Sequence, residues 1–229
     1  MALIRFPEGQ QRSGSSGGIV FSHNRFGAYI RPRTVPVNPN STAQQGVRNS
    51  FGGLAIDWQG LTAGQRDAWD SYAAVIAWQN KFGDSVFLTG FNWYVLTNSL
   101  RLAAGLLQLD DGPIVLSQGP APTGVSFTGD VSSDEISVVF DNTQGWATAV
   151  GGALYLQQGI AQPPSRTFFA SPYRTLGVVV GAVVPPTSPA AFTPVFPISV
   201  GNRTYVRYRA LYPDGRVSPP LQASFLAVA

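Results

Sequence analysis

The chain has 229 residues, of which 44% are hydrophobic and only 12% are charged, and this length is sufficient for one large domain or two modest ones. It has no cysteine and a single histidine, which excludes a disulfide framework, a thiolate metal site and a cysteine nucleophile. An aromatic content of 12% is too high for a chain that is disordered throughout. The composition therefore favours a folded protein that is not an enzyme.

Residues 1–40 are predicted to form an extended arm. A Gly/Ser tract at 13–18 is typical of flexible chain. The residues from Ile19 to Arg31 then alternate with a period of two, which predicts a single extended strand. The proline-rich segment 32–39 excludes a helix or a central strand, because each proline fixes φ and lacks an amide donor. Such an arm has little core of its own, so we expect it to lie across a partner.

Residues 41–105 are predicted to form a small bundle of three short helices. Each helix has a Ser or Thr placed to accept a hydrogen bond from the free amides of its first turn. In the second helix, Thr62 and Gln65 have the spacing of a capping box. Apolar residues at spacings of three and four give the helices faces to pack together. The expected starts are Ser41 or Thr42, Thr62, and Thr89, and the third helix is expected to end near Gly105.

Residues 106–122 are predicted to be a linker, and residues 123–229 to form a β-sandwich. The linker is rich in Pro, Gly and Asp, and after it short strands alternate with turn signals. Pro213-Asp214-Gly215 predicts a hairpin turn between the last two strands. The fold class is therefore α+β: an extended N-terminal arm, a small helical module and a C-terminal antiparallel β-sandwich. The expected strands are 125–128, 135–140, 149–157, 166–169, 176–184, 196–200, 203–212 and 221–228.

The segment from Gly201 to Ser218 resembles the last hairpin of fibronectin type III domains. In that family, a Tyr after a tight turn opens a strand of alternating apolar and basic residues, and an Asp-Gly type of turn follows. Tyr205 stands where that family has its tyrosine-corner residue, and Phe140 lies in the region of its usual core Trp. The resemblance implies a fibronectin III-like or immunoglobulin-like sandwich.

The front half, about residues 13–105, resembles an uncharacterised group of tailed-phage and prophage virion-associated proteins. The resemblance is carried by the Gly/Ser-rich start and by four motifs: NRFGAYIRPR at 24–33, PVNP at 36–39, LTAGQRDAW at 61–69 and TGFNWY at 89–94. It implies a component of the virion and supplies no catalytic residues.

The arm carries the candidate partner-binding residues, in which arginines alternate with aromatic side chains. Such residues can clamp carboxylates of a protein partner, or bind phosphates and stack on bases. Six arginines over the first 48 residues are few for neutralising a nucleic-acid backbone, and an alternating strand suits addition to the sheet edge of a partner. We therefore favour a protein partner over nucleic acid. The candidates are Val20, Arg25, Phe26, Tyr29, Ile30, Arg31 and Arg33.

No catalytic, cofactor or metal site is expected. Four acids, Asp130, Asp134, Glu135 and Asp141, are close in sequence but lack the spacing of a calcium loop, so they are interpreted as turn residues. His23 is interpreted as a contact residue, because it has no evident catalytic or ligand partner.

No membrane association is expected either. The longest apolar run has nine residues, too few to span a bilayer, and the start lacks the apolar core of a signal peptide. We therefore expect a soluble protein made in a cytoplasm.

These features together predict a phage virion structural protein, assembled in the host cytoplasm. It would be a capsid decoration (cement) or minor capsid protein whose arm binds the major capsid protein or other virion proteins, with self-association in the particle. Three alternatives stay open: a component of the tail, neck or baseplate; a glycan-binding adhesin module; and a DNA-contacting protein inside the head.

Overall fold

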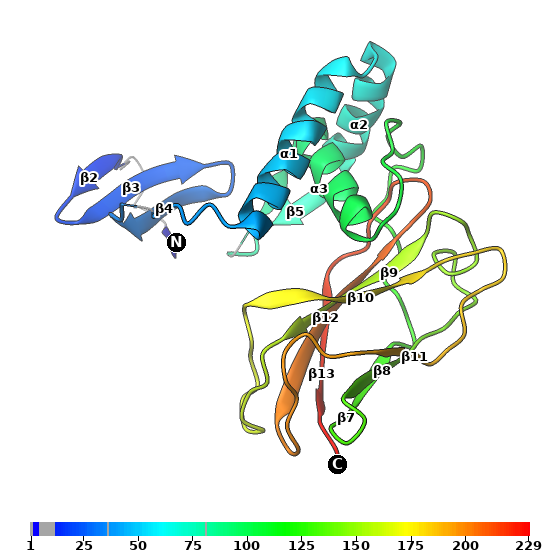
Figure 1. The fold of residues 1–229 in the computed structure, drawn as a ribbon. Coiled ribbons are helices and arrows are strands. Elements are labelled where there is room, and N and C mark those ends of the chain that lie inside the picture. The colour runs from blue at the N-terminus through cyan, green and yellow to red at the C-terminus, as the bar shows by residue number, and fades with distance from the viewer. Residues whose placement is uncertain (1, 5–11, 36, 81) are drawn as a thin grey trace.

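The computed structural model describes residues 2–4, 12–35, 37–80 and 82–229, and within them it contains three helices and four sheets. Figure 1 shows three parts: an N-terminal sheet that stands to one side, a group of helices, and a β-sandwich that carries the C-terminus. The predicted α+β class, with an arm, a helical module and an antiparallel sandwich, is confirmed.

The arm is a small antiparallel sheet rather than one strand. Its prediction as a single strand is wrong, because the chain reverses at Arg25 and Phe26, and Asn24 pairs with Gly27. Gly27 has a φ of 119°, a backbone conformation that glycine adopts at least cost. The sheet has the order β1-β4-β3-β2, with the strands β1 (Ala2–Ile4), β2 (Gly14–Ser16), β3 (Ile19–Asn24) and β4 (Gly27–Pro32).

The helical module consists of α1 (Thr42–Gly60), α2 (Ala63–Val75) and α3 (Gly90–Ala103). The predicted caps are confirmed, since the side chains of Ser41, Thr62 and Thr89 each accept from an amide three residues ahead. The capping box of α2 is complete, with both reciprocal bonds formed. A hairpin not predicted from the sequence, β5 (Ala77–Gln79) and β6 (Ser85–Phe87), connects α2 to α3.

Aromatic rings form the core of the helical module. The rings of Trp69, Tyr72, Trp93 and Tyr94 are almost completely buried and meet edge to face, an arrangement that adds to the stabilisation from burial. The Trp69 indole donates to the carbonyl oxygen of Asp110 at 2.9 Å, which holds the predicted linker against α2.

The sandwich has seven strands, four in one sheet and three in the other, as in immunoglobulin-like domains. The sheets have the orders β10-β9-β12-β13 and β11-β8-β7. The predicted segments 166–169 and 196–200 are not strands, and β11 was not predicted. The strands are β7 (Ser126–Asp130), β8 (Glu135–Val139), β9 (Ala153–Gly159), β10 (Tyr173–Val180), β11 (Ala190–Phe192), β12 (Arg203–Leu211) and β13 (Leu221–Leu226).

The core of the sandwich contains a tryptophan that comes from a loop. Trp146, after β8, is fully buried and its ring packs on Phe140 at 5.5 Å between centroids. The Trp146 side chain fills the core between the two sheets, in which inward-facing apolar residues alternate along each strand with outward-facing ones. Phe140 is therefore a core residue, and Trp146 supplies the indole beside it.

Candidate interaction surfaces

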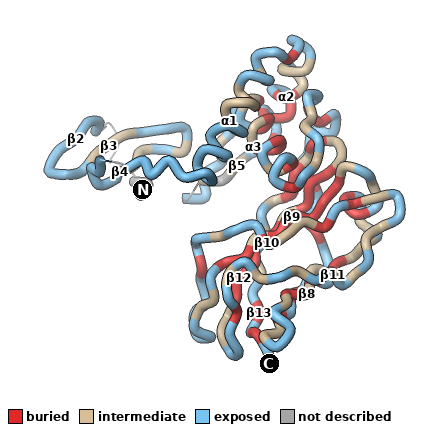
Figure 2. The backbone as a smooth tube through the Cα atoms, in the orientation of Figure 1, coloured by how far each residue is buried: buried red, intermediate tan, exposed pale blue. Residues whose placement is uncertain are grey.

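Residues 12–35 of the arm sheet form no buried core. Among residues 12–35, every side chain is exposed or only half-buried, whereas the sandwich and the inner faces of the helices contain many buried residues (Figure 2). A small sheet normally needs a buried hydrophobic face to be stable in water. The arm is therefore a folded element whose stabilising contacts are incomplete within the described chain.

The two faces of the arm sheet differ in chemistry. Directly paired residues of antiparallel strands share a face, so Phe21 lies with Ile30, and Ile19 lies with Pro32, on an apolar face. The opposite face carries Val20 paired with Arg31 and Ser22 paired with Tyr29, followed by the turn pair Asn24 and Gly27.

The reversal at positions 25 and 26 explains this arrangement. In a single extended strand Val20 and Ile30 would share a face, but the turn shifts the alternation between the two strands and places them on opposite faces. Of the predicted contact residues, Tyr29 and Arg31 share the face of Val20, whereas Ile30 lies on the apolar face.

The turn of the arm contacts the helical module. Arg25 donates from Nη1 to the carbonyl oxygen of Phe87 at 2.6 Å, and Asn80 donates from Nδ2 to the carbonyl oxygen of Phe26 at 3.1 Å. Arg25 and Phe26 were predicted to bind a partner, and both are thus already hydrogen-bonded to the hairpin β5–β6 of their own chain. Arg33, after β4, is exposed and bonds to Gly18 through its backbone amide.

A second incompletely covered surface lies between α1 and α3. The predicted apolar face of α1 packs in the C-terminal half of the helix, where Leu54 is buried, but Val47 and Phe51 remain 73% and 53% exposed. With Val95 and Leu102 of α3, they line an apolar groove of about 570 Å³.

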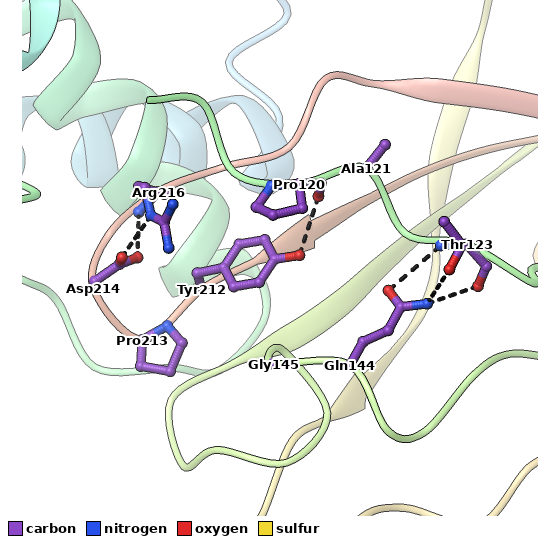
Figure 3. Close-up of a pocket in the computed structure, with 9 residues that line it drawn as sticks. All are labelled: Pro120, Ala121, Thr123, Gln144, Gly145, Tyr212, Pro213, Asp214 and Arg216. Carbon is purple, nitrogen blue, oxygen red and sulfur yellow. Dashed lines mark hydrogen bonds and ion pairs between the residues drawn. The ribbon is translucent and has the colours of Figure 1, made fainter. Parts of the chain in front are cut away.

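A third surface is a pocket of about 600 Å³ between the predicted linker and the sandwich (Figure 3). Tyr212 donates from its hydroxyl to the carbonyl oxygen of Pro120 at 3.1 Å, and Asp214 forms an ion pair of 2.6 Å with Arg216. Gln144 bonds to Thr123 through both ends of its amide. The Tyr212 ring gives a ligand a surface to stack on, and the Gln144 amide and the Asp214–Arg216 ion pair can form hydrogen bonds with it. Among the residues that line this pocket, no nucleophile lies beside a base, so they do not form a hydrolytic site.

Of the four predicted turn acids, Asp134 lies in the turn between β7 and β8, Asp141 lies in a loop after β8, and Asp130 and Glu135 are the paired end residues of these two strands. Asp130 accepts from the amide and hydroxyl of Ser132, and these bonds hold the pKa of its carboxyl below the usual value. Asp141 bonds in the same way to Thr143, with the same effect on its pKa. Across the described ranges, no group of three or more His, Cys, Asp or Glu residues could hold a metal ion.

Tyr205 does not form a tyrosine corner. Its hydroxyl donates to the carbonyl oxygen of Arg166 at 2.6 Å, a residue 39 positions earlier, whereas the corner bond reaches only a few residues upstream. The Tyr205 ring also stacks on Phe169 at 5.6 Å. Tyr205 thus ties the long loop between β9 and β10 to the outer face of the sheet.

Comparisons with known proteins add a structural likeness. No family model matches the chain, and no curated protein matches it. A solved structure of an Fn3-like protein from Clostridium thermocellum matches with 17% identity and a TM-score of 0.32, covering 49% of this chain and 97% of that one. Among the helices of the described part of the chain, none is long and apolar enough to cross a membrane.

Proposed function

We propose that this protein is a phage virion structural protein, a capsid decoration (cement) or minor capsid protein that binds neighbouring subunits through its arm. The proposal rests mainly on one observation: a four-stranded sheet with an apolar face and no buried side chain in residues 12–35. The resemblance of residues 13–105 to virion-associated proteins supports the same assignment. The proposal includes no enzymatic activity and no cofactor.

The arm can bind a partner in two complementary ways. Its apolar face, with Ile19, Phe21 and Ile30, would be covered by the major capsid protein or another virion protein, which removes apolar surface from water. The edge strands β1 and β2 can pair with a strand of the partner, because their outer main-chain groups are at the sheet edge. The exposed side chains of Arg31 and Arg33 would then meet carboxylates on that partner.

Incorporation into particles tests this proposal. A phage that lacks the gene is complemented with the wild-type chain, with a chain lacking residues 1–40, or with a Phe21→Ser, Ile30→Ser double variant. We expect both altered chains to stay folded and to be lost from purified particles. Val183→Ser with Val184→Ser is the control, because these exposed residues lie in the sandwich. Normal incorporation of the double variant would contradict the arm as the binding element.

Copy number separates the capsid function from the nearest alternative. A cement protein covers the shell and is present in hundreds of copies, whereas a tail, neck or baseplate component occurs in about a dozen. Quantitative mass spectrometry of particles, with the major capsid protein as internal reference, decides between them.

The pocket of Figure 3 supports glycan binding as a second candidate function. Its amide and ion pair are groups that can hold sugar hydroxyls, its aromatic ring can stack on a sugar, and it lies between the predicted linker and the sandwich. A glycan array with the wild-type chain and with an Asp214→Ala variant tests this function. Binding to a defined glycan that the variant loses would support it, and the absence of binding would remove it.

A further inference from the structure

One face of the sandwich carries a row of arginines, formed by Arg203, Arg207 and Arg209 of β12. On the same strand, Val206 and Tyr208 belong to the sandwich core. Because successive side chains of a strand point to opposite faces, the arginines point outward. We call these three residues the arginine row.

The arginine row is held by neutral groups. Arg207 donates from Nε and Nη2 to Oε1 of Gln157, at 2.9 and 2.8 Å, and lies over the Tyr173 ring at 4.6 Å. Arg203 donates to the carbonyl oxygen of Pro164 and to Oγ of Ser224. Two positions of the row are therefore fixed in place, but their charges are not neutralised by these acceptors.

Arg209 is the least compensated member of the arginine row. Burial and the neighbouring charge of Arg207 lower its pKa to about 10, and Tyr155 is the group that acts in the opposite direction. Within the described residues, no carboxylate contributes to that pKa, and no ion pair joins the row to an acid. A half-buried guanidinium beside a second one is a site where an anionic oxygen would be strongly stabilised.

The same sandwich has an acidic turn, formed by Asp130, Asp134 and Glu135 between β7 and β8. Asp130 pairs directly with Glu135 across the two strands, so two carboxylates lie side by side, and Asp134 is exposed at the tip. An aspartate carboxyl is ionised at neutral pH, and the bonds from Ser132 and Ser133 lower the pKa of Asp130 further.

The acidic turn and the arginine row lie in different sheets of the sandwich. The turn belongs to the three-stranded sheet, and the row faces outward from the four-stranded sheet. Among the described residues, no ion pair joins the two surfaces within one chain.

We propose that the acidic turn of one copy binds the arginine row of a second copy. The side chains of the arginine row are half-buried rather than covered, so a narrow hairpin tip can approach them, and guanidinium groups bind carboxylates with two parallel hydrogen bonds. The two surfaces differ, so the contact is head to tail and builds a chain or a closed ring of subunits. This contact is independent of the arm, and it gives the proposed virion protein a second way to bind its neighbours.

Sedimentation velocity of the full-length protein tests this contact at low and high salt. We expect association that increases with concentration at 0.01 M salt and disappears at 1 M salt, where the Debye length falls from about 30 to about 3 Å. Arg209→Glu alone and Glu135→Arg alone should each remain monomeric. A mixture of the two variants should associate, because the first retains a native turn and the second a native arginine row.

Two controls separate this contact from other kinds of association. Arg174→Glu makes the same charge change on β10, where Arg174 lies over the Phe196 ring, and it should associate like the wild type. The Phe21→Ser, Ile30→Ser variant should also associate, so that failure of the arm proposal and failure of this one are distinguishable. Thermal melts confirm that each variant is folded.

Three results would overturn the inference. The first is a wild-type protein that stays monomeric at low salt, and the second is an Arg209→Glu variant that associates normally. The third is a protein that stays monomeric and whose arginine row binds phosphate, sulfate or an acidic peptide in titrations. The row would then be a binding site for another anion and not for the acidic turn of a second copy.

Discussion

Arg101 of α3 donates a hydrogen bond of 3.2 Å to the carbonyl oxygen of Tyr212, in the turn after β12. The same guanidinium donates to the carbonyl oxygens of Leu107 and Gly151, at 2.7 and 3.0 Å, and the residue is only 3% exposed. Its charge is thus compensated by three main-chain dipoles. These bonds join the helical module, the predicted linker and the sandwich at one point, beside apolar contacts between α3 and β9.

Replacing Arg101 by methionine should destabilise the protein by about 3 kcal/mol, because three carbonyl oxygens, of which that of Tyr212 is buried, lose their donor. The free energy of unfolding from urea denaturation measures this effect. Arg166→Met is the matched control, since Arg166 is exposed and its bonds lie at the surface, and it should change stability by less than about 0.5 kcal/mol. Equal stability of the two variants would show that Arg101 does not hold the modules together.

The helix starts and the last hairpin could be predicted because local rules decide them. The capping residues act within three positions, and the turn at 213–215 closes with bonds between Tyr212 and its neighbours Gly215 and Arg216. In such segments the hydrogen-bonding partners are close in sequence, so the pattern of residues is enough to predict the local structure.

The arm and the Arg101 junction depend on contacts that sequence patterns do not contain. The alternating composition from Ile19 to Arg31 fits one long strand and also two strands joined by a short turn, and the pairing of Asn24 with Gly27 that decides between them is seen only in the structure. The partners of Arg101 lie up to 111 positions away. The segment 166–169 has strand composition, but Phe169 stacks on Tyr205 and Arg166 accepts its hydroxyl bond, so tertiary contacts hold it outside the sheets.

Alkaline pH should unfold the helical module. Burial raises the pKa of Tyr72 and of Tyr94 to about 12, above the value of 10 for an exposed phenol. The unfolded chain therefore loses these protons first, and stability that is present below pH 10 is lost as pH rises towards 12. Phenolate absorbance at 295 nm and tryptophan fluorescence are followed together from pH 9 to 13, and the last of the eight tyrosines to ionise should do so in the same step as the fluorescence change. Complete ionisation of all eight tyrosines without a change in fluorescence would contradict this coupling.

The Tyr72 hydroxyl should be dispensable. It is buried, and it has no hydrogen-bond partner in the described structure, whereas the Tyr94 hydroxyl accepts from Gln108 at 2.8 Å. Tyr72→Phe keeps the ring contacts with Trp69 and Trp93 and removes an unsatisfied polar group, so stability should stay equal or rise by about 1 kcal/mol. Tyr94→Phe is the comparison and should lower stability by a similar amount. Urea midpoints measure both variants, and a large loss for Tyr72→Phe would indicate a partner that the hydroxyl binds.

The capping box of α2 should contribute measurably to stability. Thr62→Ala removes the acceptor for the amide of Gln65, and the expected loss is about 1 kcal/mol. Ser71→Ala, at an exposed position within the same helix, is the control and should change stability by less than about 0.5 kcal/mol. Thermal melting followed by circular dichroism at 222 nm compares the two variants. An unchanged melting temperature for Thr62→Ala would mean that tertiary packing alone fixes the helix start.

Two glycines should respond to alanine in opposite directions. A Cβ atom at Gly181 would overlap the carbonyl oxygen of Trp146 and lie 2.8 Å from that of Ala149, so backbone would have to move. Gly181→Ala should therefore lower stability by about 2 kcal/mol. At Gly53, inside α1, nothing lies within 4 Å of the added atom, and Gly53→Ala should raise stability by up to about 1 kcal/mol because alanine favours the helix. Urea denaturation of both variants measures the difference. A destabilised Gly53→Ala variant would mean that α1 binds another surface closely at this position.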